Sequence, residues 1–270
     1  ICFGAFAGIA TKKLAELIKN TLNLNKTITY IILIIILGII VLQPISAAKN
    51  VVGSQVPSMN DQWYEALIKI KEDSKEDAII NSWWDFGHWF KAIGDRGVTL
   101  DGGGQNQPQA HWLGKLMLAK DEKETLGVLR LILCGKNYPY NKIKELLEDD
   151  LKTKLLLDQI IIVEKEEAEN ILKDNNIVGE DAKYILDRTH CDPPEDYFIT
   201  SQDMVSKAGV WGHFGSWDFT KASMYNKVKG KGKDEGIKIL TEEFKLDEKT
   251  SKDYYSEIQT IDADQWISPW

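Results

Sequence analysis

The pattern of apolar and polar residues changes sharply along this chain, and its first section is almost entirely apolar. Residues 27–48 read TITYIILIIILGIIVLQPISAA, a run of 22 residues without a charge. About 20 apolar residues of helix cross the ~30 Å hydrocarbon core of a bilayer, and a cleavable signal peptide has a shorter apolar region. The pattern therefore predicts a transmembrane helix over residues 27–48.

The residues before this helix predict its topology. Residues 1–10 read ICFGAFAGIA, without an initiating Met, and are expected to be the end of a preceding transmembrane helix. Residues 11–26 carry four lysines and one glutamate, and lysine-rich connections stay on the cytoplasmic side. We therefore expect a cytoplasmic loop at 11–26 and an extracytoplasmic domain at 49–270. The chain is interpreted as the C-terminal fragment of a multi-pass protein of the cell membrane.

After residue 49 the apolar residues recur at the spacing of amphipathic helices. The spacing i, i+3, i+4 predicts helices over 60–74 and within the segments KETLGVLRLIL, YNKIKELLEDDLKTKLLLDQIIIV and KEEAENILKDNN. Pro108 and Asp218 mark the starts of two more helices, and Ser201 is expected to cap a third. The segments VWGHFG and KVKGKGKDEG are interpreted as loops, because glycine disfavours a regular helix.

Two short apolar runs, DAIINSWW and DYFIT, predict short strands. Gly87 is expected to allow the turn from the first strand into the helix HWFKAIGDR. The predicted fold class is mainly α with short β elements (α+β), with one transmembrane helix followed by a globular extracytoplasmic domain. The final residues, DADQWISPW, contain no clear terminal element, so we expect the domain to be truncated at its C-terminus.

Charge and cysteine content narrow the possible functions. The 33 Lys and Arg residues against 41 Asp and Glu residues give a net charge of −8, which argues against binding driven by phosphate neutralisation on nucleic acid. Of the three cysteines, Cys2 lies at membrane depth. Cys134 and Cys191 have two open alternatives, a disulfide in an oxidising compartment or two free thiols.

Candidate chemistry concentrates in three segments rich in aromatic residues and glycine: 83–90, 101–112 and 211–218. In the first, Trp83 and Trp84 supply two indole N–H donors and Asp85 supplies a carboxylate acceptor, a set that complements an alcohol hydroxyl. An Asp buried beside apolar rings would need a hydrogen-bond partner. Two other interpretations stay open: Asp85 caps the helix that begins at Gly87 while one Trp packs in the core, or the rings stack on sugar.

Metal and nucleophile chemistry have weaker support in the sequence. Three histidines lie near acidic residues, but none shows the i, i+4 spacing or the Cys–His pattern of a zinc site; they are His88, His111 and His213. Ser216 in the sequence Gly215-Ser216-Trp217 lacks the second glycine of a nucleophile elbow. We therefore expect no metal site and no serine nucleophile in this chain.

The segment NSWWDFGHWF resembles the WWDYG signature of the catalytic subunit of oligosaccharyltransferase. The segments LDGGGQNQPQAHWLGKLMLA and SQDMVSKAGVWGHFGSWDF resemble the same family, in its archaeal AglB-type branch, and the resemblance covers essentially the whole chain. It implies transfer of a preassembled glycan from a dolichol-linked phosphate carrier to the Asn of an Asn-X-Ser/Thr sequon. It also implies that the sequon hydroxyl is bound by Trp83, Trp84 and Asp85, with Phe86 and Gly87 completing the motif and Phe86 replacing the family's Tyr.

A second family motif, Asp-x-x-Lys followed by Met or Ile, resembles the segment that begins at Asp218. The resemblance implies that Asp218, Lys221 and Met224 lie near the acceptor. The register differs, because the family has Met or Ile four positions after Lys, where this chain has Tyr225. A local ion pair between Asp218 and Lys221 is the structural alternative.

The resemblance also implies what this chain lacks. The family's catalytic acids and its Mg²⁺ or Mn²⁺ ligands lie in external loops of earlier membrane helices, so the chain alone is expected to be inactive and to hold neither catalytic residues nor metal ligands. Its implied partners are a sequon-bearing polypeptide, a lipid-linked oligosaccharide and the membrane, with no nucleic acid. The sequon Asn25-Lys26-Thr27 is expected to stay unmodified on the cytoplasmic side.

Two other functional classes remain as alternatives at this stage. The first is a membrane-anchored, non-catalytic carbohydrate-binding module that holds sugar on Trp83, Trp84, Trp89 and Trp112. The second is a purely structural domain of a transporter. An acceptor site predicts that Asp85→Ala abolishes peptide binding or glycosylation in the full-length protein. A carbohydrate-binding module would keep most of its affinity in that variant and depend on exposed rings instead, and in a structural domain neither change would matter beyond stability.

Overall fold

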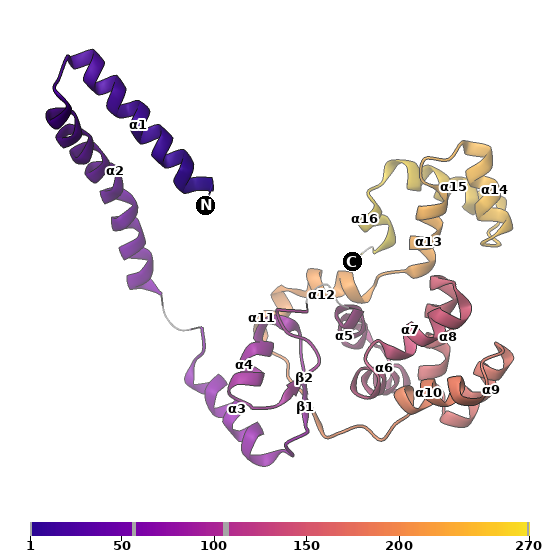
Figure 1. Cartoon of the computed structure of the whole chain (residues 1–270). Coiled ribbons are helices and arrows are strands. Elements are labelled where there is room, and N and C mark those ends of the chain that lie inside the picture. The colour runs from indigo at the N-terminus through magenta and orange to yellow at the C-terminus, as the bar shows by residue number, and fades with distance from the viewer. Residues whose placement is uncertain (1, 56–57, 105–107, 269) are drawn as a thin grey trace. The chain divides into compact units, whose positions relative to one another are not determined.

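A computed structural model describes residues 2–55, 58–104, 108–268 and 270 of the chain (Figure 1). The chain divides into two compact units, Ile1–Asn60 and Asp61–Trp270. The first unit contains the apolar segment, and the second contains all of the residues proposed above to recognise an acceptor.

The first unit is a hairpin of two helices, α1 (Cys2–Leu22) and α2 (Lys26–Ser54) (Figure 1). The chain reverses at Asn23, which has a φ of 50°, and Asn25 then caps α2 by accepting a 2.9 Å hydrogen bond from the Ile28 N–H. Within α2, the stretch Lys26–Gly53 is long and apolar enough to cross a membrane, with a mean hydropathy of 2.7. The connection expected at 11–26 is helical as far as Leu22.

The second unit is built from helices and one small sheet, in agreement with the predicted mainly α fold with short β elements. Its helices are α3 (Asp61–Asp73), the 3-10 helix η1 (Trp84–Phe86), α4 (Gly87–Ala92), α5 (Pro108–Leu118), α6 (Glu122–Cys134), α7 (Tyr138–Leu147), α8 (Asp150–Ile161), α9 (Lys165–Asp174), α10 (Gly179–Thr189), α11 (Gln202–Ser206), α12 (Ala208–Gly215), α13 (Phe219–Val228), α14 (Lys233–Glu242), α15 (Glu248–Thr260) and α16 (Ala263–Ile267).

The sheet places the first candidate motif. Its strands β1 (Ile79–Asn81), β2 (Gly97–Val98) and β3 (Asp196–Phe198) are parallel, in the order β2-β1-β3. Asn81 ends the central strand, and its amide donates a 3.0 Å hydrogen bond to Asp196 and accepts one from the Thr99 hydroxyl. Because β1 is held on both sides, the residues that follow it start from a fixed point at the carboxyl end of a parallel sheet.

The apolar side chains form two separate cores in this unit. The larger one gathers buried residues mainly from α5, α6, α8 and α10, and it includes Trp83 and Trp112. The smaller one joins α13, α14, α15 and α16 through Met224, Val228, Leu240, Ile258, Trp266 and Ile267. The two candidate motifs therefore rest on different cores.

Two glycines allow α5 and α12 to touch at their backbones. A Cβ on Gly114 would lie 2.4 Å from the Trp211 carbonyl oxygen, and a Cβ on Gly215 would lie 2.2 Å from the Gly114 carbonyl carbon. The segment VWGHFG lies within helix α12, so its interpretation as a loop is wrong. Its glycines serve close packing between helices, which a sequence pattern alone does not distinguish from a turn.

Cys134 and Cys191 form a disulfide, with their Cα atoms 5.9 Å apart. The bridge ties the end of α6 to the segment after α10 across a sequence separation of 57. In the chain-entropy model a loop of this size stabilises the folded state by about 4 kcal/mol. Of the two alternatives left open by the sequence, the structure has the disulfide.

Other differences from the sequence pattern lie in the helical region. The segment YNKIKELLEDDLKTKLLLDQIIIV contains two helices, α7 and α8, because Glu148 has a φ of 50° and Asp149 then caps α8. Helices α10, α14 and α15 were not predicted, and α14 begins inside the stretch interpreted as a basic loop. The final stretch contains α16, capped by Asp262.

Candidate functional site

Trp83 and Trp84 follow β1 directly and have different environments. Trp83 is only 2% exposed and belongs to the larger core, whereas Trp84 is half-buried. Their ring centroids lie 4.0 Å apart, and the Phe214 ring of α12 lies 5.9 Å from Trp83 and 5.7 Å from Trp84. Trp83 therefore anchors the motif, and Trp84 forms the side that solvent can reach.

Asp85 lies in η1 and is accessible to solvent, so the expectation of a buried Asp is wrong. Its Oδ1 atom lies 2.8 Å from the Lys207 Nζ atom, and 26% of its side chain is exposed. It does not cap α4, because the cap position belongs to Phe86 and no side chain makes a capping bond there. Its position between an aromatic wall and a lysine leaves the carboxylate able to accept further hydrogen bonds.

Lys207 is a site residue that the sequence pattern did not single out. Its Nζ atom also lies 2.8 Å from Asp203 Oδ2 and 5.6 Å from the centroid of the Phe86 ring. Burial lowers the pKa of Lys207, but hydrogen bonds to Asp203 and Asp85 outweigh it and raise the pKa above its ordinary value. The ammonium is therefore charged at neutral pH and holds both carboxylates.

Gly87 is required by close packing rather than by a turn. Its φ of −56° and ψ of −32° are helical, so any residue could adopt its backbone conformation. A Cβ there would lie 2.6 Å from both the Asp101 Cβ and the Leu100 carbonyl oxygen. The expectation that Gly87 supplies a flexible turn is corrected: its missing side chain lets η1 and α4 pack on residues 100–101.

Phe86, which replaces the family's Tyr, packs on the outer side of the motif. Its ring stacks on Trp89 at 4.5 Å and lies 4.9 Å from the Trp63 ring of α3. These contacts are aromatic and need no hydroxyl, so the position keeps its packing role with Phe.

The second motif begins with a helix cap. Asp218 Oδ1 accepts a 2.9 Å hydrogen bond from the Lys221 N–H at the start of α13. The Lys221 ammonium instead reaches α16, where it donates to the Trp266 carbonyl at 3.3 Å and lies 5.2 Å from the Trp266 ring centroid. Met224 is 5% exposed in the smaller core. The alternative of a side-chain ion pair between Asp218 and Lys221 is thus replaced by a cap and a contact with α16.

His111 and Phe214 link the two motifs. Phe214, which contacts Trp83 and Trp84, accepts a 2.9 Å hydrogen bond at its carbonyl from His111 Nδ1–H. The His111 ring lies 5.0 Å from the Phe219 ring, next to Asp218. Burial lowers the His111 pKa to about 3, so the imidazole is neutral at neutral pH. Its buried Nε2 atom has no hydrogen-bond partner among the described residues.

Beside His111 lies a polar hollow of about 250 Å³ whose lining includes Lys154, Asp158 and Asp218. Lys154 is 4% exposed, lies 2.5 Å from Asp158 and sits near the rings of Trp112 and Phe219, at 4.8 and 5.0 Å. Burial lowers the pKa of Lys154 to about 8. The sequence offered no signal for it, since Lys–Asp pairs at i, i+4 usually lie on exposed helix surfaces.

The histidines do not assemble a metal centre in the part of the chain that the structure describes, where no group of three His, Cys, Asp or Glu side chains could hold an ion. His88 is exposed and lies 4.0 Å from Asp101, which is held by Lys91 and by the Gly103 N–H at 2.8 Å. The hydrogen bond from Lys91 lowers the Asp101 pKa. His213 packs against Phe214 and Trp217.

Comparison with known proteins identifies the family. The chain is 31% identical to the dolichyl-phosphooligosaccharide-protein glycotransferase of Methanocaldococcus jannaschii over 218 residues, which are 78% of this chain and 23% of that protein. It is 32% identical to the protein of the same name from Methanococcus voltae over 228 residues, 81% of this chain and 24% of that protein. The chain belongs to the oligosaccharyltransferase family.

The likeness within this family extends to eukaryotes at lower coverage. The dolichyl-diphosphooligosaccharide–protein glycosyltransferase subunit STT3 of Saccharomyces cerevisiae is 29% identical over 82 residues, 29% of this chain and 11% of that protein. The chain spans 23% and 24% of the length of the two archaeal relatives. It therefore corresponds to about a quarter of a family member.

No family profile matches the chain. Among solved structures, the C-terminal domain of C. jejuni pglb is similar at 18% identity and a TM-score of 0.33, covering 56% of this chain and 52% of that one. A TM-score this low does not establish a shared fold.

The structure weighs against the carbohydrate-binding alternative. Two of its four proposed sugar-stacking rings, Trp83 and Trp112, are each only 2% exposed, and the ammonium of Lys154 lies over Trp112. A buried ring cannot stack on a sugar face. Of the four, only Trp84 and Trp89 are partly accessible.

Proposed function

We propose that this chain forms the acceptor-recognition part of a larger glycotransferase that transfers an oligosaccharide from a dolichol-linked phosphate carrier to the Asn of an Asn-X-Ser/Thr sequon. The names and similarity of the archaeal relatives support the reaction class. The observation that carries the assignment of the site is the accessible Asp85 carboxylate, which lies beside Trp84 and is held at Oδ1 by Lys207.

The arrangement suits a hydroxyl ligand. The Ser or Thr hydroxyl would donate its hydrogen to the Asp85 carboxylate, which can accept more hydrogen bonds than the one from Lys207 at Oδ1. The hydroxyl oxygen would accept from a donor at the rim, such as the Trp84 indole. A valine at the same sequon position offers neither bond, so Asp85 would lose solvent without a replacement. That loss costs about 1–3 kcal/mol and discriminates against the valine peptide.

The chemistry of transfer would come from the rest of the longer protein. A bound Mg²⁺ or Mn²⁺ ion would polarise the phosphate leaving group there, and we propose that its ligands and the catalytic acids lie outside this chain. The residues described here would bind and orient the acceptor. Without the remainder, the chain is expected to have no transferase activity.

Two features support an extracytoplasmic position for the second unit. Its Cys134–Cys191 disulfide is typical of oxidising compartments, and the lysines before the apolar helix favour a cytoplasmic connection. The sequon at Asn25 would then lie on the cytoplasmic face, where no glycan is expected.

The proposal can be tested in the longer protein that contains this chain, reconstituted in membranes with its lipid-linked glycan and a divalent metal. Wild type should glycosylate an Asn-X-Thr peptide and not its Asn-X-Val analogue, and Asp85→Ala should modify neither. Asp181→Ala is the matched control. Asp181 lies on α10, outside the motif, and also pairs with a lysine, Lys142 of α7, at 2.9 Å. Full activity of a folded Asp85→Ala variant would contradict the assignment of Asp85 to the acceptor site.

A further inference from the structure

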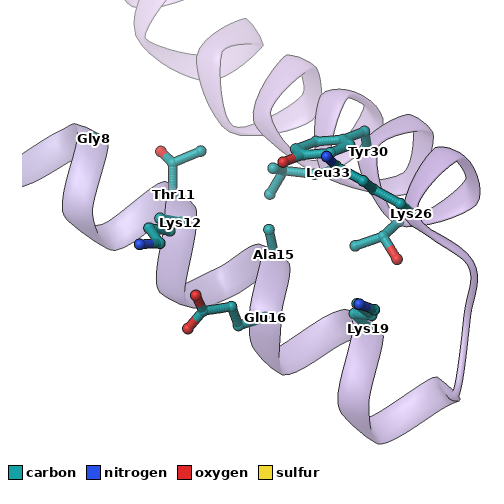
Figure 2. A pocket seen from close by; sticks show the side chains of 10 residues that line it. Gly8, Thr11, Lys12, Ala15, Glu16, Lys19, Lys26, Tyr30 and Leu33 are labelled. Carbon is teal, nitrogen blue, oxygen red and sulfur yellow. The ribbon is translucent and has the colours of Figure 1, made fainter.

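The helical hairpin of the first unit contains a groove that the glycotransferase proposal does not use. The groove lies between α1 and α2, has a volume of about 400 Å³ and is lined by Gly8, Thr11, Lys12, Ala15, Glu16, Lys19, Lys26, Thr29, Tyr30 and Leu33. Figure 2 shows Lys12, Glu16 and Lys19 on α1, with Lys26, Tyr30 and Leu33 on α2. All of these residues belong to one compact unit.

The groove carries an excess of positive charge. Three lysines, Lys12, Lys19 and Lys26, face a single carboxylate, that of Glu16. Within the residues that the structure describes, none of these lysines makes an ion pair with an acidic side chain. Ammonium groups gathered without counter-charges repel one another, and a ligand that supplies negative charge relieves the repulsion.

The depth of Lys12 relative to the apolar span of α2 makes an anion more favourable still. Lys26 begins the stretch Lys26–Gly53 that can cross a membrane. Lys12 lines the same groove as Leu33, which lies seven residues farther along α2, or about 10 Å at 1.5 Å per residue. Lys12 therefore lies at the level of the apolar span rather than beyond it. A lysine at that depth is costly unless its head reaches the interface or meets an anion.

The groove also has the apolar component that a lipid requires. Leu33 is 4% exposed, Ala15 is half-buried, and Gly8 offers no side chain, so part of the lining is apolar. Tyr30 is 48% exposed, as aromatic residues at the boundary between membrane and water commonly are. The Thr29 hydroxyl donates its hydrogen to the Asn25 carbonyl at 2.9 Å and therefore does not donate to a phosphate.

We propose that this groove binds the phosphate of an anionic phospholipid, with Lys12, Lys19 and Lys26 around the headgroup and an acyl chain along the apolar lining. Basic clefts between membrane helices on the cytoplasmic side are suited to such headgroups. A free phosphate would satisfy the charge but leave the apolar lining uncovered. The inference does not depend on glycan transfer, because it concerns a different unit of the chain.

The test uses the longer protein in phosphatidylcholine vesicles that contain a photoactivatable phosphatidylglycerol. Cross-links should map to residues 8–33, and a photoactivatable phosphatidylcholine should give far fewer. The double variant Lys12→Gln/Lys19→Gln should lower the yield by about fivefold for each lysine removed. The matched control for the single variant Lys12→Gln is Lys13→Gln, which removes the same charge from the adjacent position of α1, outside the groove lining, and should leave the yield unchanged.

Three outcomes would overturn the proposal. Equal yields from Lys12→Gln and Lys13→Gln would mean that general surface charge attracts the lipid. Loss of the cross-link on adding inorganic phosphate at constant ionic strength would assign the groove to a free anion. If Lys12→Gln/Lys19→Gln lowered the thermal midpoint of the protein and left the cross-link intact, the lysines would pair with a carboxylate of another segment instead.

Discussion

At the scale of single residues, the candidate site depends on a lysine far from it in sequence. The Lys207 ammonium lies 2.8 Å from Asp85 and 2.8 Å from Asp203. It therefore fixes the Asp85 carboxylate, which we propose binds the sequon hydroxyl. An Asp that is already oriented loses less conformational freedom when a hydroxyl binds. Lys207 is therefore a positioning residue for acceptor binding rather than a group that touches the reacting atoms.

We predict that Lys207→Met raises the KM for an Asn-X-Thr peptide about fivefold to thirtyfold, as expected when lost positioning weakens acceptor binding by about 1–2 kcal/mol, and leaves kcat nearly unchanged. Lys207→Arg should restore most of the affinity, because it keeps the charge. The control is Lys227→Met, since Lys227 also pairs with a carboxylate, Glu243 at 2.6 Å, and lies 5.6 Å from the Phe244 ring. Steady-state kinetics of all three variants would show whether the effect is specific.

If Lys207→Met and Lys227→Met changed the KM equally, the lysine would act on stability alone. An unchanged KM in Lys207→Met would show that Asp85 needs no positioning.

At the scale of secondary structure elements, the contact between α5 and α12 decides where Phe214 lies. Gly114 and Gly215 bring the two helices together at their backbones, and the Phe214 carbonyl accepts the hydrogen bond from His111. The Phe214 ring then packs against both tryptophans of the first motif. The geometry of the site therefore depends on the absence of side chains at two positions outside it.

We predict that Gly114→Ala destabilises the second unit by about 1–3 kcal/mol, because the added methyl would meet rigid backbone at 2.4 Å. Gly209→Ala on α12 is the matched control: a Cβ there meets nothing within 4 Å, and alanine favours a helix by up to about 1 kcal/mol. Denaturant unfolding followed by tryptophan fluorescence would measure both. Equal stability of the two variants would contradict the close contact.

At the scale of the whole molecule, a basic helical hairpin, with five lysines and one glutamate, is joined to an acidic unit that holds buried ionisable groups. His111 is the clearest of them, because burial lowers its pKa from 6.5 to about 3. As the pH falls below 6.5, His111 binds a proton in the unfolded chain but stays neutral in the folded protein until the pH approaches 3. The stability that neutral His111 contributes is therefore complete above pH 6.5 and is lost as the pH falls toward 3.

We predict that His111→Asn makes the loss of stability between pH 6.5 and pH 3 less steep, because Asn cannot titrate there and its amide can still donate to the Phe214 carbonyl. His88→Asn serves as the control, since the His88 side chain is 65% exposed. The urea midpoint at several pH values would give the slope for each variant. Identical slopes for wild type and His111→Asn would mean that carboxylates alone cause the acid sensitivity.

The sequence by itself determined the features that depend on local composition. An uncharged run of 22 residues specified the apolar helix α2, the apolar run before Trp83 specified strand β1, and Asp218 specified the cap of α13. The aromatic and acidic motifs also revealed the family. Each of these follows from residues that are neighbours in the chain, which is where propensity and capping act.

Tertiary structure alone decided the environment of each candidate group. A sequence does not show that Asp85 is open to solvent and tied to Lys207, or that an ordinary Lys–Asp spacing buries Lys154. Nor does it show that Gly87 and Gly114 serve close contacts between elements rather than turns. The physical reason is the same throughout: burial, pairing and steric contact are set by residues brought together by folding, at separations that no local pattern encodes.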